Sequence, residues 1–149
     1  MVFGDQVNYT VNLLTISYRS EAILLDPIRD IISILEESRT RNAAHGITGV
    51  LLFDGTFFLQ TIEGPPEKTQ EVFASIVADR RHKEVKTLGI QEIEERDFPN
   101  WHMELIGSDE TARIVPDMRN LEFSYGRLRE IQAMSVGMAR QRKEPVSSY

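Results

Sequence analysis

The sequence contains no cysteine. Disulfide bonds, thiolate nucleophiles, cysteine-ligated zinc and iron–sulfur clusters are therefore excluded. No apolar run approaches the roughly 20 residues of a membrane-spanning helix. Residues 1–12 also lack the basic stretch and apolar segment of a secretory signal. We therefore expect a cytoplasmic protein that does not insert into a membrane.

Motifs of the common enzyme classes are missing as well. The sequence has no GxGxxG, P-loop or GxSxG pattern, and nothing in it pairs a nucleophile with a base. The histidines His45, His82 and His102 form no i, i+4 pair and have no carboxylate at metal-ligand spacing. We therefore expect no metal site and no enzymatic activity of the chain itself.

Positive charge is scarce, since 17 Lys and Arg face 23 Asp and Glu, for a formal net charge of −6. A surface that binds nucleic acid needs an excess of Lys and Arg, so we expect no nucleic-acid partner. From Arg113 onward, seven Lys and Arg face four Asp and Glu, which leaves ten against nineteen in the preceding part. This basic tail is compatible with a partner surface and with a solvated helix face.

What is present suits one domain with a real core, because 41% of the 149 residues are hydrophobic. Residues Val11–Tyr18 alternate in the manner of a strand. One face of this strand carries Leu14, Ile16 and Tyr18. Asp26-Pro27 is typical of a helix start, because Asp accepts hydrogen bonds from free backbone N–H groups and Pro lacks only a donor that would be unpaired. We expect this helix to end at about Arg41 or Asn42.

The middle of the chain contains the clearest local pattern. The apolar runs Gly49–Phe53 and Thr56–Ile62 flank Asp54-Gly55, the pair that a tight type I′ hairpin turn demands. Pro65-Pro66-Glu67 then opens a second helix, whose apolar stripe consists of Val72, Phe73, Ile76 and Val77. Residues Lys86–Ile93 are predicted to form another strand.

A last strand is predicted from the alternation of Trp101, Met103 and Leu105 with polar residues, which places these three side chains on one buried face. The resulting order favours an α+β, ferredoxin-like βαββαββ sheet with two helices on one face. A C-terminal amphipathic helix is predicted from Leu128, Ile131, Met134 and Met138. Its apolar face either covers the bare side of the sheet or forms a dimer contact.

Two polar side chains fall on apolar strand faces. Gln60 shares a face with Phe58 and Ile62, and a buried amide without partners costs about 1–3 kcal/mol. The Tyr18 hydroxyl needs a partner for the same reason. Gln60 could bond to the backbone or face solvent, and Tyr18 could be an ordinary core residue. Alternatively, the two side chains could bond each other and a flat heteroaromatic ligand.

Two further polar groups could reach the same space. Asn42 ends the first predicted helix, where it could be a C-cap or could bond the edge of a ring that carries carbonyl and N–H groups. The polar residues Asp79–Lys83 close the second helix, where cations are favoured by the helix dipole and could also bind a phosphate.

Taken together, these residues resemble the BLUF domains, blue-light receptors that use a flavin, over about Leu13–Ile106. The resemblance rests on five segments: Ser17-Tyr18-Arg19-Ser20, Asn42 to Gly46-Ile47-Thr48-Gly49, Phe58-Leu59-Gln60 with Glu63-Gly64, Asp79 with Arg81-His82, and Phe98-Pro99 with Trp101 and Met103. It implies the same ferredoxin-like fold. We expect an N-terminal extension at residues 1–10, a flavin-binding domain at residues 11–107 and a C-terminal helical extension at residues 108–149.

The resemblance also implies a site for FAD, with FMN possible, between the two helices. Its ring would insert among Ile31, Ile34 and Ile76. By similarity, Asn42 bonds the polar edge of the ring, Gln60 sits beside N5 and the C4 carbonyl, and Tyr18 bonds Gln60. The ribityl and phosphate end would lie near Asp79, Arg81 and His82. Many relatives carry a basic residue where this chain has Ser75, and Arg41 or Arg81 could compensate for it.

In this family, the excited flavin takes an electron from the tyrosine, a proton moves, and the charges recombine, leaving the glutamine rotated or tautomerised. Here these residues would be Tyr18 and Gln60, with Trp101 and Met103 relaying the change to the C-terminal helices. About 40 residues follow the last predicted strand, too few for a cyclase or phosphodiesterase domain. We expect a homo-oligomeric photoreceptor that signals through its C-terminal helices, either to a separate protein or by changing its own assembly. In this family the separate protein can be a cyclic-di-GMP phosphodiesterase or a transcriptional regulator.

Two other function classes fit a ferredoxin-like sheet. A small acyl-phosphate hydrolase would use Asn42 and Arg41 to hold a phosphate. A flavin-free dimerisation module would have Tyr18 and Gln60 contact only protein. The colour of the isolated protein separates both from a flavin-binding photoreceptor.

Overall fold

The computed structural model describes residues 12–120, 122 and 124–143, so the extension expected at residues 1–10 lies outside the described residues. Five strands and four helices follow one another in the described part. They are β1 (Leu13–Ala22), α1 (Pro27–His45), β2 (Thr48–Phe53), β3 (Phe57–Gly64), α2 (Pro66–Val77), β4 (His82–Ile93), β5 (Glu104–Ile106), α3 (Ser108–Ile114) and α4 (Tyr125–Lys143).

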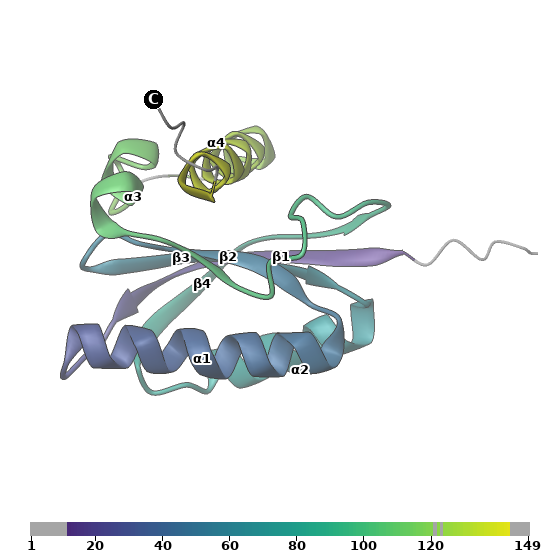
Figure 1. The fold of residues 1–149 in the computed structure, drawn as a ribbon, viewed down its shortest axis with the longest axis horizontal. Helices are drawn as coiled ribbons and strands as arrows, with labels where there is room; N and C mark the ends of the chain where they lie inside the picture. Colours follow the sequence, from purple (N-terminus) through teal and green to yellow (C-terminus); the bar gives the residue numbers. More distant parts are fainter. Residues whose placement is uncertain (1–11, 121, 123, 144–149) are drawn as a thin grey trace, which may run out of the picture.

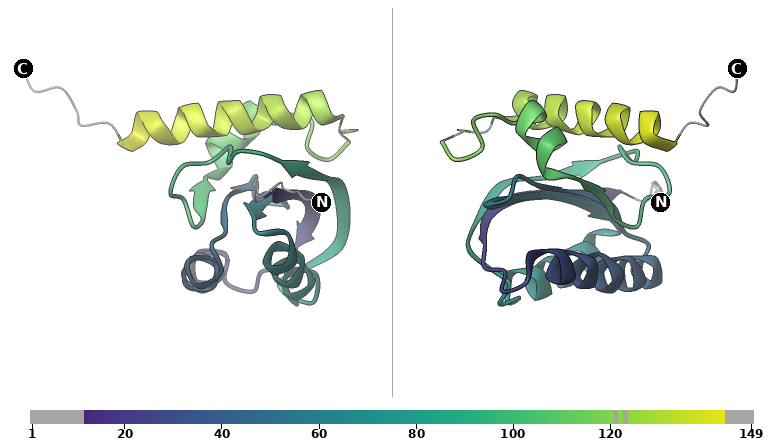
Figure 2. Two further views of the ribbon diagram at one scale, coloured as in Figure 1. Left: turned by 90° about the vertical axis from the view of Figure 1, so that its right-hand side faces the viewer. Right: turned by 60° about the vertical axis from the view of Figure 1, so that its left-hand side comes forward.

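The five strands form one mixed sheet in the order β4-β1-β3-β2-β5. Its neighbours are antiparallel except for β2 and β5, which are parallel. Helices α1 and α2 lie on one face of the sheet, and α3 and α4 lie on the other (Figures 1 and 2). The predicted ferredoxin-like α+β arrangement is therefore confirmed.

The second face of the sheet is covered by α4. Ile131 and Ala139 of this helix join a buried cluster with Val50, Leu52 and Leu59 of the sheet. Because successive residues of a strand point to opposite faces, β2 and β3 contribute to this cluster with one set of residues and to the α1 and α2 side with the other. Of the two alternatives for the C-terminal helix, the structure has the one in which it covers the sheet.

Helix α1 begins as predicted and ends later than predicted. The side chain of Asp26 caps it by accepting from the backbone N–H of Arg29, and Pro27 is its first residue. The helix continues to His45 because Gly46 supplies a left-handed cap, with φ of 70°, whose N–H bonds the carbonyl of Asn42. The predicted end at Arg41 or Asn42 is therefore wrong, and Asn42 lies inside the helix.

The predicted hairpin is present as β2 and β3, but its turn differs from type I′. Phe53 pairs with Phe58, and the backbone N–H of Asp54 donates to the Phe57 carbonyl, so the two loop residues are Gly55 and Thr56 rather than the predicted Asp54 and Gly55. Gly55 has φ of 99°, but Thr56 does not have the second positive φ that type I′ requires. The side chain of Asp54 accepts from the backbone N–H groups of Thr56 (2.8 Å) and Phe57 (2.7 Å). These side-chain bonds organise the turn.

The end of the sheet departs most from expectation. Strand β4 begins four residues before the predicted Lys86, and β5 begins only at Glu104, after Trp101 and Met103. Met103 joins the buried cluster under α1 and α2, whereas Trp101 packs with Phe98 in the cluster under α4. The prediction that Trp101 and Met103 share one face is wrong, because strict alternation holds only inside a regular strand.

Candidate functional site

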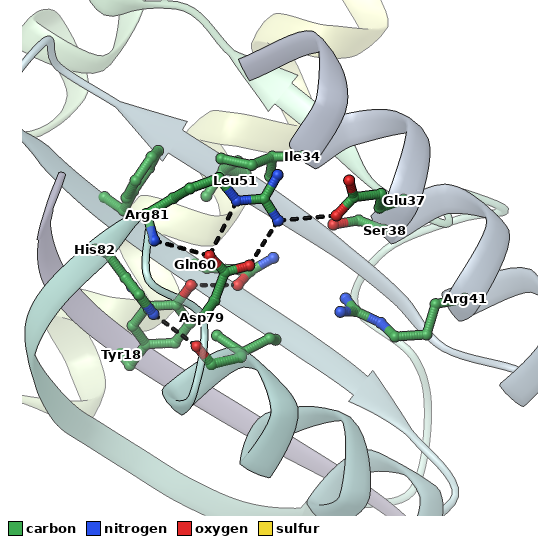
Figure 3. Close-up of a pocket in the computed structure, with 12 residues that line it drawn as sticks. Tyr18, Ile34, Glu37, Ser38, Arg41, Leu51, Gln60, Asp79, Arg81 and His82 are labelled. Carbon is green, nitrogen blue, oxygen red and sulfur yellow. Dashed lines mark hydrogen bonds and ion pairs between the residues drawn. The ribbon is translucent and has the colours of Figure 1, made fainter. Parts of the chain in front are cut away.

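A cavity that is partly open to solvent lies between the sheet and helices α1 and α2 (Figure 3). Its walls come from all the elements on this side of the sheet. They consist of Tyr18, Ile34, Glu37, Ser38, Arg41, Leu51, Phe58, Gln60, Ile76, Asp79, Arg81 and His82.

At the floor of the cavity, Tyr18 and Gln60 are opposite each other in the β1 and β3 register. The Tyr18 hydroxyl donates to Oε1 of Gln60 at 2.5 Å, and each residue is only 3% exposed. Burial raises the pKa of Tyr18 well above its usual range, so the phenol is a neutral donor. The Gln60 amide nitrogen contacts Sδ of Met103 at 3.5 Å, and sulfur is a weak acceptor. This amide therefore retains capacity to donate to a ligand.

Arg41 extends from α1 across the cavity toward Gln60 (Figure 3). Its Nε donates to Oδ1 of Asn42 at 3.2 Å. Its Nη2 is buried and has no hydrogen-bond partner in the part of the chain that the structure describes. Burial lowers the pKa of Arg41, but a guanidinium remains charged in proteins. An unused donor on a cation suits a carbonyl or anionic oxygen of a ligand.

A second guanidinium, that of Arg81, is already paired. Its Nη2 lies 2.6 Å from Oδ2 of Asp79 and 2.8 Å from Oε1 of Glu37, and its Nε donates to Oδ1 of Asp79 at 3.0 Å. These bonds lower the pKa of both carboxyl groups and raise that of Arg81. Because Glu37 belongs to α1 and Asp79 follows α2, the ion-pair network ties the two helices together at one side of the cavity.

His82 is buried between β1 and the end of α2. Its Nε2 lies 2.6 Å from the Ile76 carbonyl oxygen, which can only accept, so this nitrogen carries the proton. In the neutral ring, Nδ1 then accepts from the Ser20 hydroxyl at 2.7 Å. The ring meets the Tyr18 ring edge-on, with 5.8 Å between centroids. His82 therefore helps to hold the tyrosine side chain in place.

Some predicted site residues lie outside the cavity walls. Asn42 is fully buried, and its Nδ2 donates to the His102 carbonyl at 2.5 Å. Ile31 packs at the edge of the same apolar cluster, and Met103 lies behind Gln60. Trp101 lies on the opposite face of the sheet.

Other lining residues were not anticipated from the sequence. Glu37 and Ser38 follow Ile34 at the i+3 and i+4 positions of α1. Extending the helical face from Ile34 would have indicated them. Leu51 lies on β2, and only the observed register places it beside Gln60.

Metal and membrane sites are not indicated. The described residues contain no group of three or more His, Cys, Asp or Glu that could hold a metal ion. None of the helices in the described ranges is long and apolar enough to cross a membrane.

The comparisons with known proteins agree on one protein family. Residues 13–104 match the profile of the BLUF family, described as sensors of blue-light using FAD. The dark-state structure of BlrB, a BLUF protein, superposes with a TM-score of 0.78 at 37% identity and covers 87% of this chain and 99% of that one.

Two curated relatives are longer proteins. The blue light- and temperature-regulated antirepressor BluF of Escherichia coli (strain K12) is 33% identical over 93 residues, which are 62% of this chain and 23% of the relative. A photoactivated adenylate cyclase subunit beta of Euglena gracilis is 29% identical over 120 residues, 79% of this chain and 14% of the relative. The chain thus spans less than a quarter of the length of either protein.

Proposed function

The chain belongs to the BLUF family of blue-light sensors, and from this premise we propose that it binds FAD non-covalently and is switched by light through Tyr18 and Gln60. Flavin binding is a property of the family. The choice of FAD, the roles of individual residues and the output of the signal are the proposal.

The chemistry of the cavity residues fits a flavin. Ile34, Leu51 and Ile76 provide apolar walls for a flat ring. Gln60 offers an amide with spare donor capacity, and Arg41 offers a buried N–H without a partner among the described residues. A ring with carbonyl oxygens along one edge would satisfy both donors. The predicted contact of Asn42 with that edge stays a prediction, and one of the two amide N–H groups of Asn42 is already donated to the His102 carbonyl.

The observation that carries the switching role is the hydrogen bond between Tyr18 and Gln60. When bound, a flavin supplies blue-light absorption and an excited state that accepts an electron. Tyr18 is the electron donor on the cavity floor, and its hydroxyl proton already points to Oε1 of Gln60. A glutamine amide has a donor and an acceptor end, so its reorientation exchanges the hydrogen bonds that it offers to the ring.

At the other end of the flavin, Asp79, Arg81 and His82 are proposed to lie near the ribityl and phosphate groups. Ser75 supplies no cation there, because a serine side chain is neutral, and its hydroxyl donates to the Val72 carbonyl at 2.9 Å. Arg81 is shared between two carboxylates, so Arg41 is the cation with an unused donor. Release of the bound flavin and its separation by chromatography distinguishes FAD from FMN.

The proposal is tested by the absorption spectrum of the purified protein in darkness, under blue light and during dark recovery. We expect a flavin spectrum that shifts modestly to the red and returns. Tyr18→Phe should retain the bound flavin and lose the shift, because the electron and proton donor is removed. Tyr125→Phe is the matched control, since this tyrosine is 51% exposed. A normal photocycle in Tyr18→Phe would overturn the assigned role.

For the output, we propose a homo-oligomer that signals to a separate downstream protein, such as a cyclic-di-GMP phosphodiesterase or a transcriptional regulator, without catalytic turnover of its own. The name of the Escherichia coli relative, an antirepressor, supports a regulatory partner. Light scattering coupled to size-exclusion chromatography, in darkness and under blue light, measures the oligomeric state and its response. A monomer in both conditions would contradict this part of the proposal.

A further inference from the structure

Directly behind Tyr18 and Gln60, the sheet carries a second polar pair on the face that α4 covers. Ser17 and Thr61 are opposite each other in the β1 and β3 register, and each follows or precedes a cavity residue in its strand. Their hydroxyl oxygens are 2.7 Å apart, and each residue is 3% exposed. One peptide unit therefore separates the floor of the cavity from a buried hydrogen bond on the other face.

Helix α4 contacts this pair through one polar side chain, Gln132. The residue is 7% exposed, and its Nε2 lies 3.5 Å from Oγ1 of Thr61, at the outer limit of a hydrogen bond. Its Oε1 is buried without a partner among the residues that the structure describes, as is Oγ1 of Thr15, which precedes Ser17 on the same strand face. The buried amide of Gln132 is thus only partly satisfied.

The Ser17 and Thr61 pair can be oriented in two ways, because either hydroxyl can be the donor. When Thr61 donates to Ser17, its oxygen accepts from the amide nitrogen of Gln132, as observed. When Ser17 donates to Thr61, the Thr61 proton is free to point at the carbonyl end of a rotated Gln132 amide. Each orientation matches one end of the amide, so the three groups have two self-consistent arrangements.

The rotation itself needs little space. A small cavity between α4 and the sheet is lined by Thr15, Ser17 and Gln132. Rotation of the Gln132 amide exchanges two atoms of similar size, and this terminal torsion has a broad, roughly two-fold preference. A side chain with two hydrogen-bonding arrangements fits a two-state element.

We propose that Gln132 is a positioning residue for signal output, through which α4 responds to the orientation of Gln60. The inference rests on the proposed photoreceptor function. Thr61 follows Gln60 in β3, so a reorientation of Gln60 that moves this strand slightly makes or breaks the long contact to Gln132. The route runs through the middle of the sheet and is distinct from one through Trp101 and Met103 at its edge.

The experiment uses the full chain with its flavin. Hydrogen–deuterium exchange of the α4 amides is measured in darkness and under blue light, in parallel with the flavin absorption shift. Gln132→Leu removes the amide at similar size, and replacing a partly unsatisfied buried polar group by an apolar one is compatible with folding. Gln141→Leu is the matched control, because Gln141 is an exposed glutamine of the same helix.

We expect Gln132→Leu to keep the red shift of the flavin and to lose the light-dependent change in α4 exchange, whereas Gln141→Leu behaves as the wild type. If Gln132→Leu keeps the light-dependent change in α4 exchange, the inference is overturned. If Met103→Leu loses that change in such a case, the signal is assigned to the edge of the sheet. If Gln132→Leu does not fold, Thr61→Val removes the hydroxyl that Gln132 contacts and carries the same expectation. Absence of a red shift in the wild type would instead reject the proposed function.

Discussion

At the scale of single residues, the buried phenol of Tyr18 links the site to stability. Its pKa is raised, chiefly because burial penalises the phenolate. The folded state therefore keeps this proton at pH values at which the unfolded chain, with an ordinary tyrosine pKa of about 10, releases it. A raised pKa in the folded state means that the stability contribution is complete below pH about 10 and is lost as the pH rises further.

The effect of the raised Tyr18 pKa on stability can be tested in the flavin-free protein. At pH 7, Tyr18→Phe leaves Oε1 of Gln60 buried without its donor, which is expected to cost about 1–3 kcal/mol in the free energy of unfolding. Above pH about 10, only the wild type loses stability through this residue, so the gap between the two proteins should narrow. Urea unfolding of both proteins at pH 7 and above pH about 10 measures this difference in the free energy of unfolding. A constant gap would show that burial does not hold the proton of Tyr18.

How far the site could be predicted also depends on single residues. Tyr18 and Gln60 were identified because a polar group on an apolar strand face needs a partner, and the alternation of a regular strand shows the face. Asn42 was expected to reach the ligand. Its amide instead meets the His102 carbonyl, which comes from an irregular segment whose path no local pattern encodes.

At the scale of elements, glycine positions have opposite effects in a helix and in a hairpin. A Cβ atom built on Gly137 of α4 would meet no atom within 4 Å apart from its neighbours in the chain and the backbone of its own helix, whereas one on Gly49 of β2 would lie 2.3 Å from the Thr61 carbonyl oxygen. A glycine inside a helix costs about 1 kcal/mol relative to alanine because its backbone loses more freedom on folding. The Gly49 site allows the close approach of β2 and β3.

Gly137→Ala is therefore expected to stabilise the protein by up to about 1 kcal/mol. Gly49→Ala is its counterpart and should destabilise by about 1–3 kcal/mol, because backbone atoms must move to admit the methyl group. Thermal unfolding of both variants measures the two effects. Equal effects of the same sign would contradict the proximity of Gly49 to β3.

Elements with strong local patterns were predicted best. The hairpin of β2 and β3 and the start of α2 at Pro66 lie where expected, because turn residues and proline act locally. The end of α1 lies beyond the predicted stop at Arg41 or Asn42, because Gly46 and not Asn42 supplies the cap. The length of β5 was missed because residues 94–103 are held by tertiary contacts, including three bonds from Arg96 to the end of the hairpin and to Gly46.

At the scale of the whole molecule, Glu63 connects the sheet to the segment that leads toward α4. The residue is fully buried and accepts from the Thr48 hydroxyl (2.8 Å) and the backbone N–H groups of Asp97 (2.8 Å) and Phe98 (2.9 Å). The side chain of Asp97 pairs with Arg129 of α4 at 2.5 Å. Burial raises the pKa of Glu63, although these bonds oppose the shift.

Because the folded pKa of Glu63 is raised, its contribution is complete below the unfolded value of about 4.3 and is lost as the pH rises through the folded value. Glu63→Gln does not titrate there. The stability of the wild type relative to Glu63→Gln should therefore fall between acidic and neutral pH, as measured by chemical unfolding across this interval. A relative stability that rises with pH would mean that the three donors favour the carboxylate over the acid.

The role of the basic tail, the part of the chain from Arg113 onward, depends on how the helices pack in the folded chain. Arg129 pairs with Asp97, and Arg142 donates to the Leu105 carbonyl at 3.0 Å. Arg127 donates to the Ile114 carbonyl at 3.2 Å and so joins α4 to α3. These arginines contact their own chain, so part of the positive charge holds α4 in place rather than remaining free for a partner.

The two-sided use of β1 and β3 has a consequence for engineering. Even-numbered residues such as Tyr18 and Gln60 face the cavity, and odd-numbered residues such as Ser17 and Thr61 face α4. A designer could randomise the odd positions other than Ser17 and Thr61, together with the inner face of α4 other than Gln132, and leave the cavity walls as they are. The alternation of side chains along the two strands would thus allow the face under α4 to be redesigned for a new partner protein while the flavin cavity stays unchanged.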